Sequence, residues 1–317
     1  MIDYMGLVQR LILLSSSCSN FLEVVLKRWI VIVMLLLTSI VDAKKTMEKN
    51  TISVCAVFKN EGNYLKEWIE YHRLIGVDHF YLYNNMSGDH FAQVLAPYVK
   101  ERVVTLINWP DRVGGCGGER PFIWVLSTQI PAYENALKMA TTCRTKWLIF
   151  LDVSEFIVPV ADSSFKEMLS RYEGLSGISI ATDYFDASDI TALPRRKLLI
   201  ETVEMTGMPK KNPDRGITKM VFQPQTCKGF SWPPYRCVFK EGQKEIEVGR
   251  GELRINHYTK RFKGFLDLGK KKDKLHLDNR DLTETQLHDL LEEGYEIEDQ
   301  EQTISKFMPK LKEKMGF

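Results

Sequence analysis

The sequence lacks a charge imbalance. Its 317 residues carry 43 lysine and arginine side chains against 41 aspartate and glutamate side chains, a formal net charge of +2. No stripe of basic residues interleaved with aromatic ones is present either, so nucleic acid is not an expected partner. Any bound polyanion must therefore sit at a local site, and a compact anion such as a nucleotide diphosphate suits that better than a long one.

Cysteine motifs, repeats and low-complexity segments are also missing. None of the six cysteines belongs to a Cys-x-x-Cys pair, which argues against a zinc ribbon or a thioredoxin-type redox site. Cys227 and Cys237 could pair across a hairpin in an oxidising compartment. With 44% hydrophobic and 26% charged residues, the composition is that of an ordinary globular protein.

The apolar run at residues 29–41 is too short for a full membrane span. A helix of that length reaches about 20 Å, against about 30 Å of hydrocarbon core. It matches the apolar region of a signal peptide, with Val41 and Ala43 at an acceptable cleavage site. A short tilted anchor at residues 29–43, a start codon assigned too far upstream and a buried helix are the alternatives. We expect export or membrane attachment rather than a cytoplasmic location, and place residues 1–50 outside the fold.

From residue 51 the pattern alternates between strands and helices. We therefore expect an α/β domain over residues 51–275, with a mainly parallel central sheet between helices and a mixed C-terminal half, then a charged helical extension over residues 276–317. Asn63 is the expected N-cap of the first helix, and Gly76 its stop. The expected strands are 52–58, 77–83, 103–109, 147–152, 178–182, 220–223, 236–240 and 252–256. The expected helices are 65–75, 89–99 and 128–143.

Polar residues follow three of the expected parallel strands. Because open parallel sheets bind ligands outside the carboxyl ends of their strands, these residues should converge on one crevice. The residues of each group, taken alone, are typical of turns and helix caps. Their convergence at one edge of the sheet favours a ligand-binding site. The candidate ligand-binding residues are Lys59, Asn60, Glu61, Asn84, Asn85, Asp89 and Asp152.

Five blocks of the sequence form a recognisable set: 54–61 (VCAVFKNE), 64–72 (YLKEWIEYH), 76–85 (GVDHFYLYNN), 146–156 (KWLIFLDVSEF) and 255–258 (INHY). Together they resemble glycosyltransferase family 92 and related bacterial family-2-like enzymes. The resemblance spans about residues 51–270 and implies an A-type glycosyltransferase (GT-A, Rossmann-like) fold. It also implies a nucleotide-sugar donor, which the strand-end residues would bind, usually a divalent metal, and transfer with inversion at the sugar carbon.

The resemblance maps a metal-binding Asp-x-Asp motif onto Asp152 and Ser154, so the second aspartate is missing. A Mn²⁺ or Mg²⁺ ion held by carboxylates would neutralise the leaving diphosphate. Glu155 is adjacent, but on an extended segment Ser154 and Glu155 point to opposite faces. His257 resembles a late histidine that completes the metal shell in this fold. Asp152, Glu155 and His257 are thus the candidate ligands, and we expect metal affinity to be weaker than in relatives.

Inverting transfer also needs a base for the acceptor hydroxyl. Asp183, Asp186 and Asp189 follow an expected strand on the acceptor side, and we take Asp186 as the candidate base, with Asp183 second. The relatives' Phe-Gly-Ser-Ser-Gly pattern is altered here, which indicates a diverged acceptor pocket. The glycine-rich loop at 114–118 is not a P-loop, since no Gly-Lys-Ser/Thr follows it.

The sequence therefore predicts an inverting transferase that uses a UDP-sugar and a glycan or glycoconjugate acceptor. A catalytically degenerate module of the same fold that binds nucleotide sugar or glycan is the alternative, motivated by Ser154. A nucleotidyltransferase is disfavoured, because residues 59–61 do not form its glycine-rich, basic phosphate loop.

Overall fold

The computed structural model describes residues 29, 51–110, 124–186, 196–206, 218–231, 236–259 and 302–317. Apart from Trp29, they belong to one compact unit, Asn50–Phe317. No helix within these ranges is both long and apolar enough to cross a membrane. The predicted leader or anchor and the loop at 114–118 lie outside the described residues, so export and membrane attachment remain predictions.

Four parallel strands form the first half of the central sheet. In sheet order they are β3, β2, β1 and β4, which is the arrangement expected of alternating strands and helices. Their bounds are β1 Ile52–Phe58, β2 His79–Asn84, β3 Val104–Asn108 and β4 Trp147–Phe150. The helices between them are α2 Gly62–Leu74, α3 Phe91–Lys100 and α5 Ile130–Thr142, the last preceded by a π-helical segment, Val125–Gln129. The expected α/β fold is confirmed.

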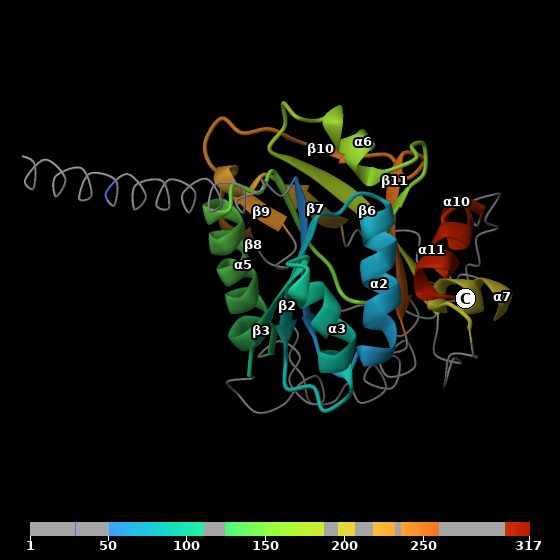
Figure 1. Ribbon diagram of the computed structural model, residues 1–317. Helices are drawn as coiled ribbons and strands as arrows, with labels where there is room; N and C mark the ends of the chain where they lie inside the picture. The colour runs from blue at the N-terminus through green and yellow to red at the C-terminus, as the bar shows by residue number, and fades with distance from the viewer. Residues whose placement is uncertain are drawn as a thin grey trace, which may run out of the picture. The chain divides into compact units, whose positions relative to one another are not determined.

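Helices cover both faces of β1, because successive side chains of a strand point to opposite sides. Val54 and Ala56 share a core with Leu65 and Trp68 of α2, and α3 lies beside α2 (Figure 1). On the other face Cys55 and Val57 pack with α5 through Ala132, Tyr133 and Ala136. Cys55 is a fully buried core residue, as expected.

The ends of α2 follow partly from local sequence and partly from a distant loop. Asn63 does not cap the helix: α2 begins at Gly62, whose N–H donates to Asp89 Oδ2 at 2.6 Å. A Cβ on Gly62 would lie 2.9 Å from that same oxygen. Gly76 has φ +103°, which confirms it as the helix stop.

The second half of the sheet is mixed. β7 runs antiparallel to both β4 and β6, β6 is parallel to β11 and β10, and β11 is antiparallel to β5. The expected parallel sheet is therefore confirmed for β1 to β4, and the second half is mixed as expected. The strand bounds are β5 Glu155–Pro159, β6 Gly177–Asp186, β7 Thr218–Phe222, β10 Glu245–Val248 and β11 Leu253–Thr259.

A separate hairpin pairs β8 (Cys227–Ser231) with β9 (Arg236–Phe239). Cys227 and Cys237 form a disulfide bond across it, with their Cα atoms 5.8 Å apart. The pairing that the spacing made possible is thus present in the structure.

The described end of the C-terminal segment packs onto the domain. It forms α10 (Gln302–Ser305) and α11 (Met308–Met315), and the two other helices described in the second half of the chain are α6 (Phe165–Ser170) and α7 (Leu199–Thr206). Phe307 meets Tyr71 of α2 edge to face, with ring centroids 5.6 Å apart, and Lys66 donates to the Met315 carbonyl. Residues 302–317 therefore cover part of α2.

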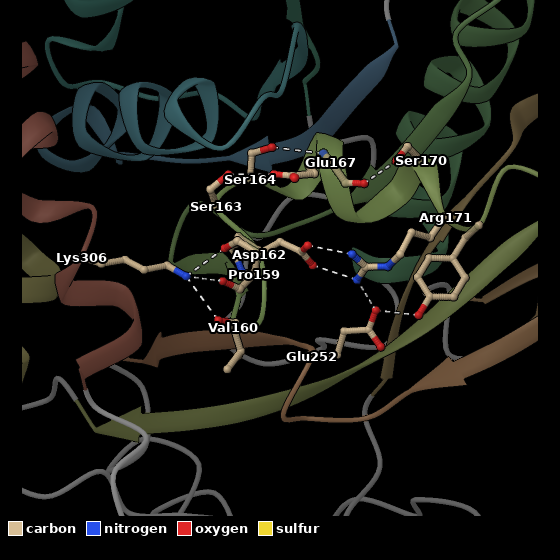
Figure 2. Close-up of polar contacts among 11 residues, drawn as sticks. Pro159, Val160, Asp162, Ser163, Ser164, Glu167, Ser170, Arg171, Glu252 and Lys306 are labelled. Atoms are coloured by element: carbon tan, nitrogen blue, oxygen red, sulfur yellow. Dashed lines mark hydrogen bonds and ion pairs between the residues drawn. The ribbon is translucent and has the colours of Figure 1, made fainter.

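A polar network adds to this docking (Figure 2). Lys306 donates to three carbonyl oxygens of the turn at 159–162. In the same turn Asp162 forms a two-pronged ion pair with Arg171, which also pairs with Glu252 before β11. Exposed ion pairs of this kind contribute little stability each, so the network mainly fixes geometry.

Candidate active site

Asp152 lies just past β4, in a tight turn that leads into β5. The Glu155 N–H donates to the Asp152 carbonyl at 3.0 Å, and the Asp152 N–H donates to Glu155 Oε2 at 2.8 Å. These reciprocal bonds close the turn. They bring the carboxylates of Asp152 and Glu155 into one cluster, which an extended backbone would not have done.

His257 joins the two carboxylates from β11. It stands opposite Glu155 in the antiparallel register of β11 and β5, so the two side chains share a face of the sheet. His257 Nδ1 lies 3.5 Å from Glu155 Oε1. One ligand atom from each of Asp152, Glu155 and His257 falls within 4.8 Å of the others. Carboxylate oxygens and an imidazole nitrogen suit Mn²⁺ or Mg²⁺, so the predicted ligands fit a divalent ion.

Lys219 of β7 is a site residue that the sequence reasoning missed. Its Nζ lies 2.9 Å from Glu155 Oε2, and both side chains are only 2% exposed. A signal was available, because Lys219 sits in the apolar run 218–222 (TKMVF), and a lysine in a buried strand needs an anionic partner. The sequence could not indicate which anion that would be.

The loops after β1, β2 and β3 are tied together by amide side chains. Asn60, with φ +57°, accepts a hydrogen bond from the Gly88 N–H at 2.8 Å. Asn84 accepts from the Ser87 N–H and donates to Asn108 Oδ1 at 3.2 Å. These predicted donor-binding residues therefore lie together at the carboxyl end of the sheet, where they also hold the loops in shape.

Asn85 and Asp89 have similar structural contacts. Buried Asn85 donates to the Trp109 carbonyl at 3.0 Å and accepts from Trp124 Nε1. Asp89 accepts from backbone N–H groups at the start of α2 and α3. Of the other predicted donor contacts, Lys59 is exposed at the end of β1, and the Glu61 carbonyl accepts the first hydrogen bonds of α2.

The two candidate bases have different positions. Asp183 stands in register with Asn256, the neighbour of His257, so it faces away from the metal-ligand cluster. Its carboxylate pairs with Arg250 and lies 3.8 Å from Arg254 Nε. The structure therefore does not bring Asp183 to the cluster.

Asp186 is the last residue of β6, and its backbone pairs with Thr259, two residues beyond His257. The Asp186 side chain lies outside the described residues, as does Asp189. Its role as the base stays a prediction.

Several family 92 glycosyltransferase proteins of plants have similar sequences. A family 92 glycosyltransferase protein of rice (Oryza sativa subsp. japonica) is 25% identical over 214 residues, which cover 66% of this chain and 33% of the relative. One from Arabidopsis thaliana is 24% identical over 229 residues, 68% of this chain and 36% of the relative. The chain thus spans about a third of the length of the curated relatives it matches.

Among solved structures, glucosyl-3-phosphoglycerate synthase from Mycobacterium tuberculosis, in complex with Mn²⁺, UDP and glucosyl-3-phosphoglycerate, is 13% identical. The match covers 70% of this chain and 76% of that one, with a TM-score of 0.35. S. aureus TarS in complex with UDP is 11% identical, covers 46% and 38% of the two chains, and has a TM-score of 0.28. The model of the family described as Glycosyltransferase family 92 matches residues 48–290. Because that match covers well over half of the sequence, the chain belongs to glycosyltransferase family 92.

Proposed function

We propose that this chain transfers a sugar from a nucleotide-sugar donor, a UDP-sugar, to a glycan or glycoconjugate acceptor with inversion at the sugar carbon. The single observation that carries the proposal is the cluster of Asp152, Glu155 and His257 directly after β4. Membership of family 92 supports the reaction class.

The chemistry explains why such a cluster belongs at this place. Cleavage of the sugar–phosphate bond leaves a nucleotide diphosphate, and a bound Mn²⁺ or Mg²⁺ would supply Lewis-acid stabilisation of that charge. Asp152 and His257, both partly exposed, would hold the ion. Exposed Lys59 directly follows the neighbouring strand β1 and can approach the same phosphates.

The acceptor side requires a proton acceptor. We assign this role to Asp186, because its backbone continues β6 beyond the residue paired with His257. An ionised carboxylate there would take the proton of the acceptor hydroxyl as the bond to the sugar forms. Asp183 is a weaker choice because arginines already neutralise it.

A turnover assay tests the proposal. The full chain, incubated with a panel of UDP-sugars and Mn²⁺, should release UDP. Asp152→Asn should lower kcat/KM by about 100-fold, since metal stabilisation of the leaving group amounts to several kcal/mol. Glu173→Gln, which alters an exposed ion pair with Lys146, is the matched control and should keep activity. No UDP release with any common donor, or an Asp152→Asn variant as active as wild type, would contradict the proposal.

A degenerate module that binds nucleotide sugar without turnover is the second candidate. Ser154 favours it, because the motif lacks its second aspartate. The same assay separates the two, since a degenerate module would bind UDP and release none from a donor.

A further inference from the structure

We propose that Lys219 is an internal cation of the metal site, which neutralises Glu155 and keeps it out of the coordination shell, so that Asp152 and His257 alone hold the ion. This inference rests on the proposed function, in which a divalent ion binds after β4. It assigns a role to a lysine that the sequence analysis did not connect with the site. In this account Glu155 is not a metal ligand; it accepts a hydrogen bond from the Asp152 N–H and so helps to position Asp152.

The contacts of Glu155 are the first argument. Its Oε2 accepts from the Asp152 N–H at 2.8 Å and lies 2.9 Å from Lys219 Nζ, while Oε1 lies 3.5 Å from His257 Nδ1. Both oxygens thus already have polar neighbours from the protein. An ion bound by Glu155 would have to compete with an ammonium group held at hydrogen-bonding distance.

Burial is the second argument. The Glu155 and Lys219 side chains are each 2% exposed, whereas His257 is 18% exposed and Asp152 is half-buried. Mg²⁺ and similar hard ions give up their water reluctantly and usually keep several water ligands. Asp152 and His257 are partly exposed and can accept such an ion at the protein surface, whereas the Glu155 side chain is buried.

The topology explains how the lysine reaches this point. β7 runs antiparallel between β4 and β6, which carries Lys219 toward the turn that follows β4. An unpaired charge at this depth would be costly, so each member of the pair stabilises the other. The ammonium cancels the charge of Glu155 and leaves Asp152 as the one uncompensated carboxylate of the cluster. The ion should then bind weakly by itself and more tightly with a nucleotide diphosphate.

The test measures Mn²⁺ affinity of the full chain by electron paramagnetic resonance of free Mn²⁺, without nucleotide or sugar. Lys219→Met should bind Mn²⁺ about tenfold more tightly, because a nearby positive charge is gone and Glu155 is released. The double variant E155Q/K219M should return to within about threefold of wild type. Lys219→Arg, which keeps the charge, and Lys312→Met, which removes a lysine–glutamate pair with Glu201 in another part of the domain, should leave the affinity unchanged.

Two results would overturn the inference. One is a folded Lys219→Met variant that binds Mn²⁺ no more tightly than wild type. The other is an E155Q/K219M double variant that binds Mn²⁺ at least tenfold more weakly than wild type, which would make Glu155 a ligand. If circular dichroism shows that Lys219→Met does not fold, the Mn²⁺ affinity of the double variant alone tests the inference. Failure of the proposed function is distinct, because it would show as absent UDP release while Lys219→Met still gained affinity.

Discussion

Two buried glutamates in this domain are accommodated in different ways. Glu155, at the start of β5, lies beside the ammonium group of Lys219 and accepts a hydrogen bond from the Asp152 N–H. Glu67, on α2, accepts hydrogen bonds from the first N–H groups of α7, those of Leu199 at 2.8 Å and Ile200 at 3.2 Å. One carboxylate is compensated by a full charge, and the other by the amino end of a helix.

The difference has a consequence for protonation. Burial, with a smaller contribution from nearby Glu201, raises the pKa of Glu67 to about 7, against the opposing effect of its two backbone hydrogen bonds. Helix amides and their dipole therefore do not fully replace the lost hydration of this carboxylate. An oppositely charged pair lies at the candidate site, whereas a carboxyl group with a pKa near neutral pH lies where α7 docks.

The largest expected effect comes from breaking the charged pair. Glu155→Gln leaves the Lys219 ammonium buried without its carboxylate, which should destabilise the domain by about 3–5 kcal/mol. Urea unfolding followed by circular dichroism measures this. The double variant E155Q/K219M should recover most of the loss, because neither buried charge remains. Equal losses in the single and double variants would mean that the pair acts through packing rather than charge.

Glu67→Gln should have a smaller effect that depends on pH. The native state holds the Glu67 proton more tightly than the unfolded chain does, so the stability contributed by this proton is complete below pH 4.5 and is lost as pH rises through about 7. Glutamine stays neutral throughout. The stability of Glu67→Gln relative to wild type should therefore increase by about 3 kcal/mol between pH 4.5 and pH 8. Urea unfolding at these two pH values checks the difference, and a constant difference would contradict the account.

Much of the fold was predictable because its signals are local. The apolar run at 52–58 coincides with β1, and the family match agrees with the A-type glycosyltransferase fold that the sequence blocks implied. β5 was missed because its run is short and its partner β11 lies far along the chain. The cap of α2 was also missed, since Asp89 reaches it from the loop after β2.

The candidate site was predictable to a similar degree. Asp152 and Glu155 stood out by residue type and by their place after an expected strand, and His257 through the family resemblance. The structure brings all three together. Lys219 depends on which strand lies beside β4, and that is a property of sheet order rather than of local sequence. Asp183 was proposed from its place after an expected strand, and that place does not reveal the face of the strand on which its side chain lies.

The most direct measurement is the position of a Mn²⁺ ion, located by anomalous scattering in crystals of the full chain grown with UDP and Mn²⁺. We expect one ion after β4, bound by the Asp152 carboxylate and the His257 imidazole and in contact with the UDP diphosphate, with Lys219 still beside Glu155. UDP bound at another part of the domain, or an ion that touches neither Asp152 nor His257, would contradict the account.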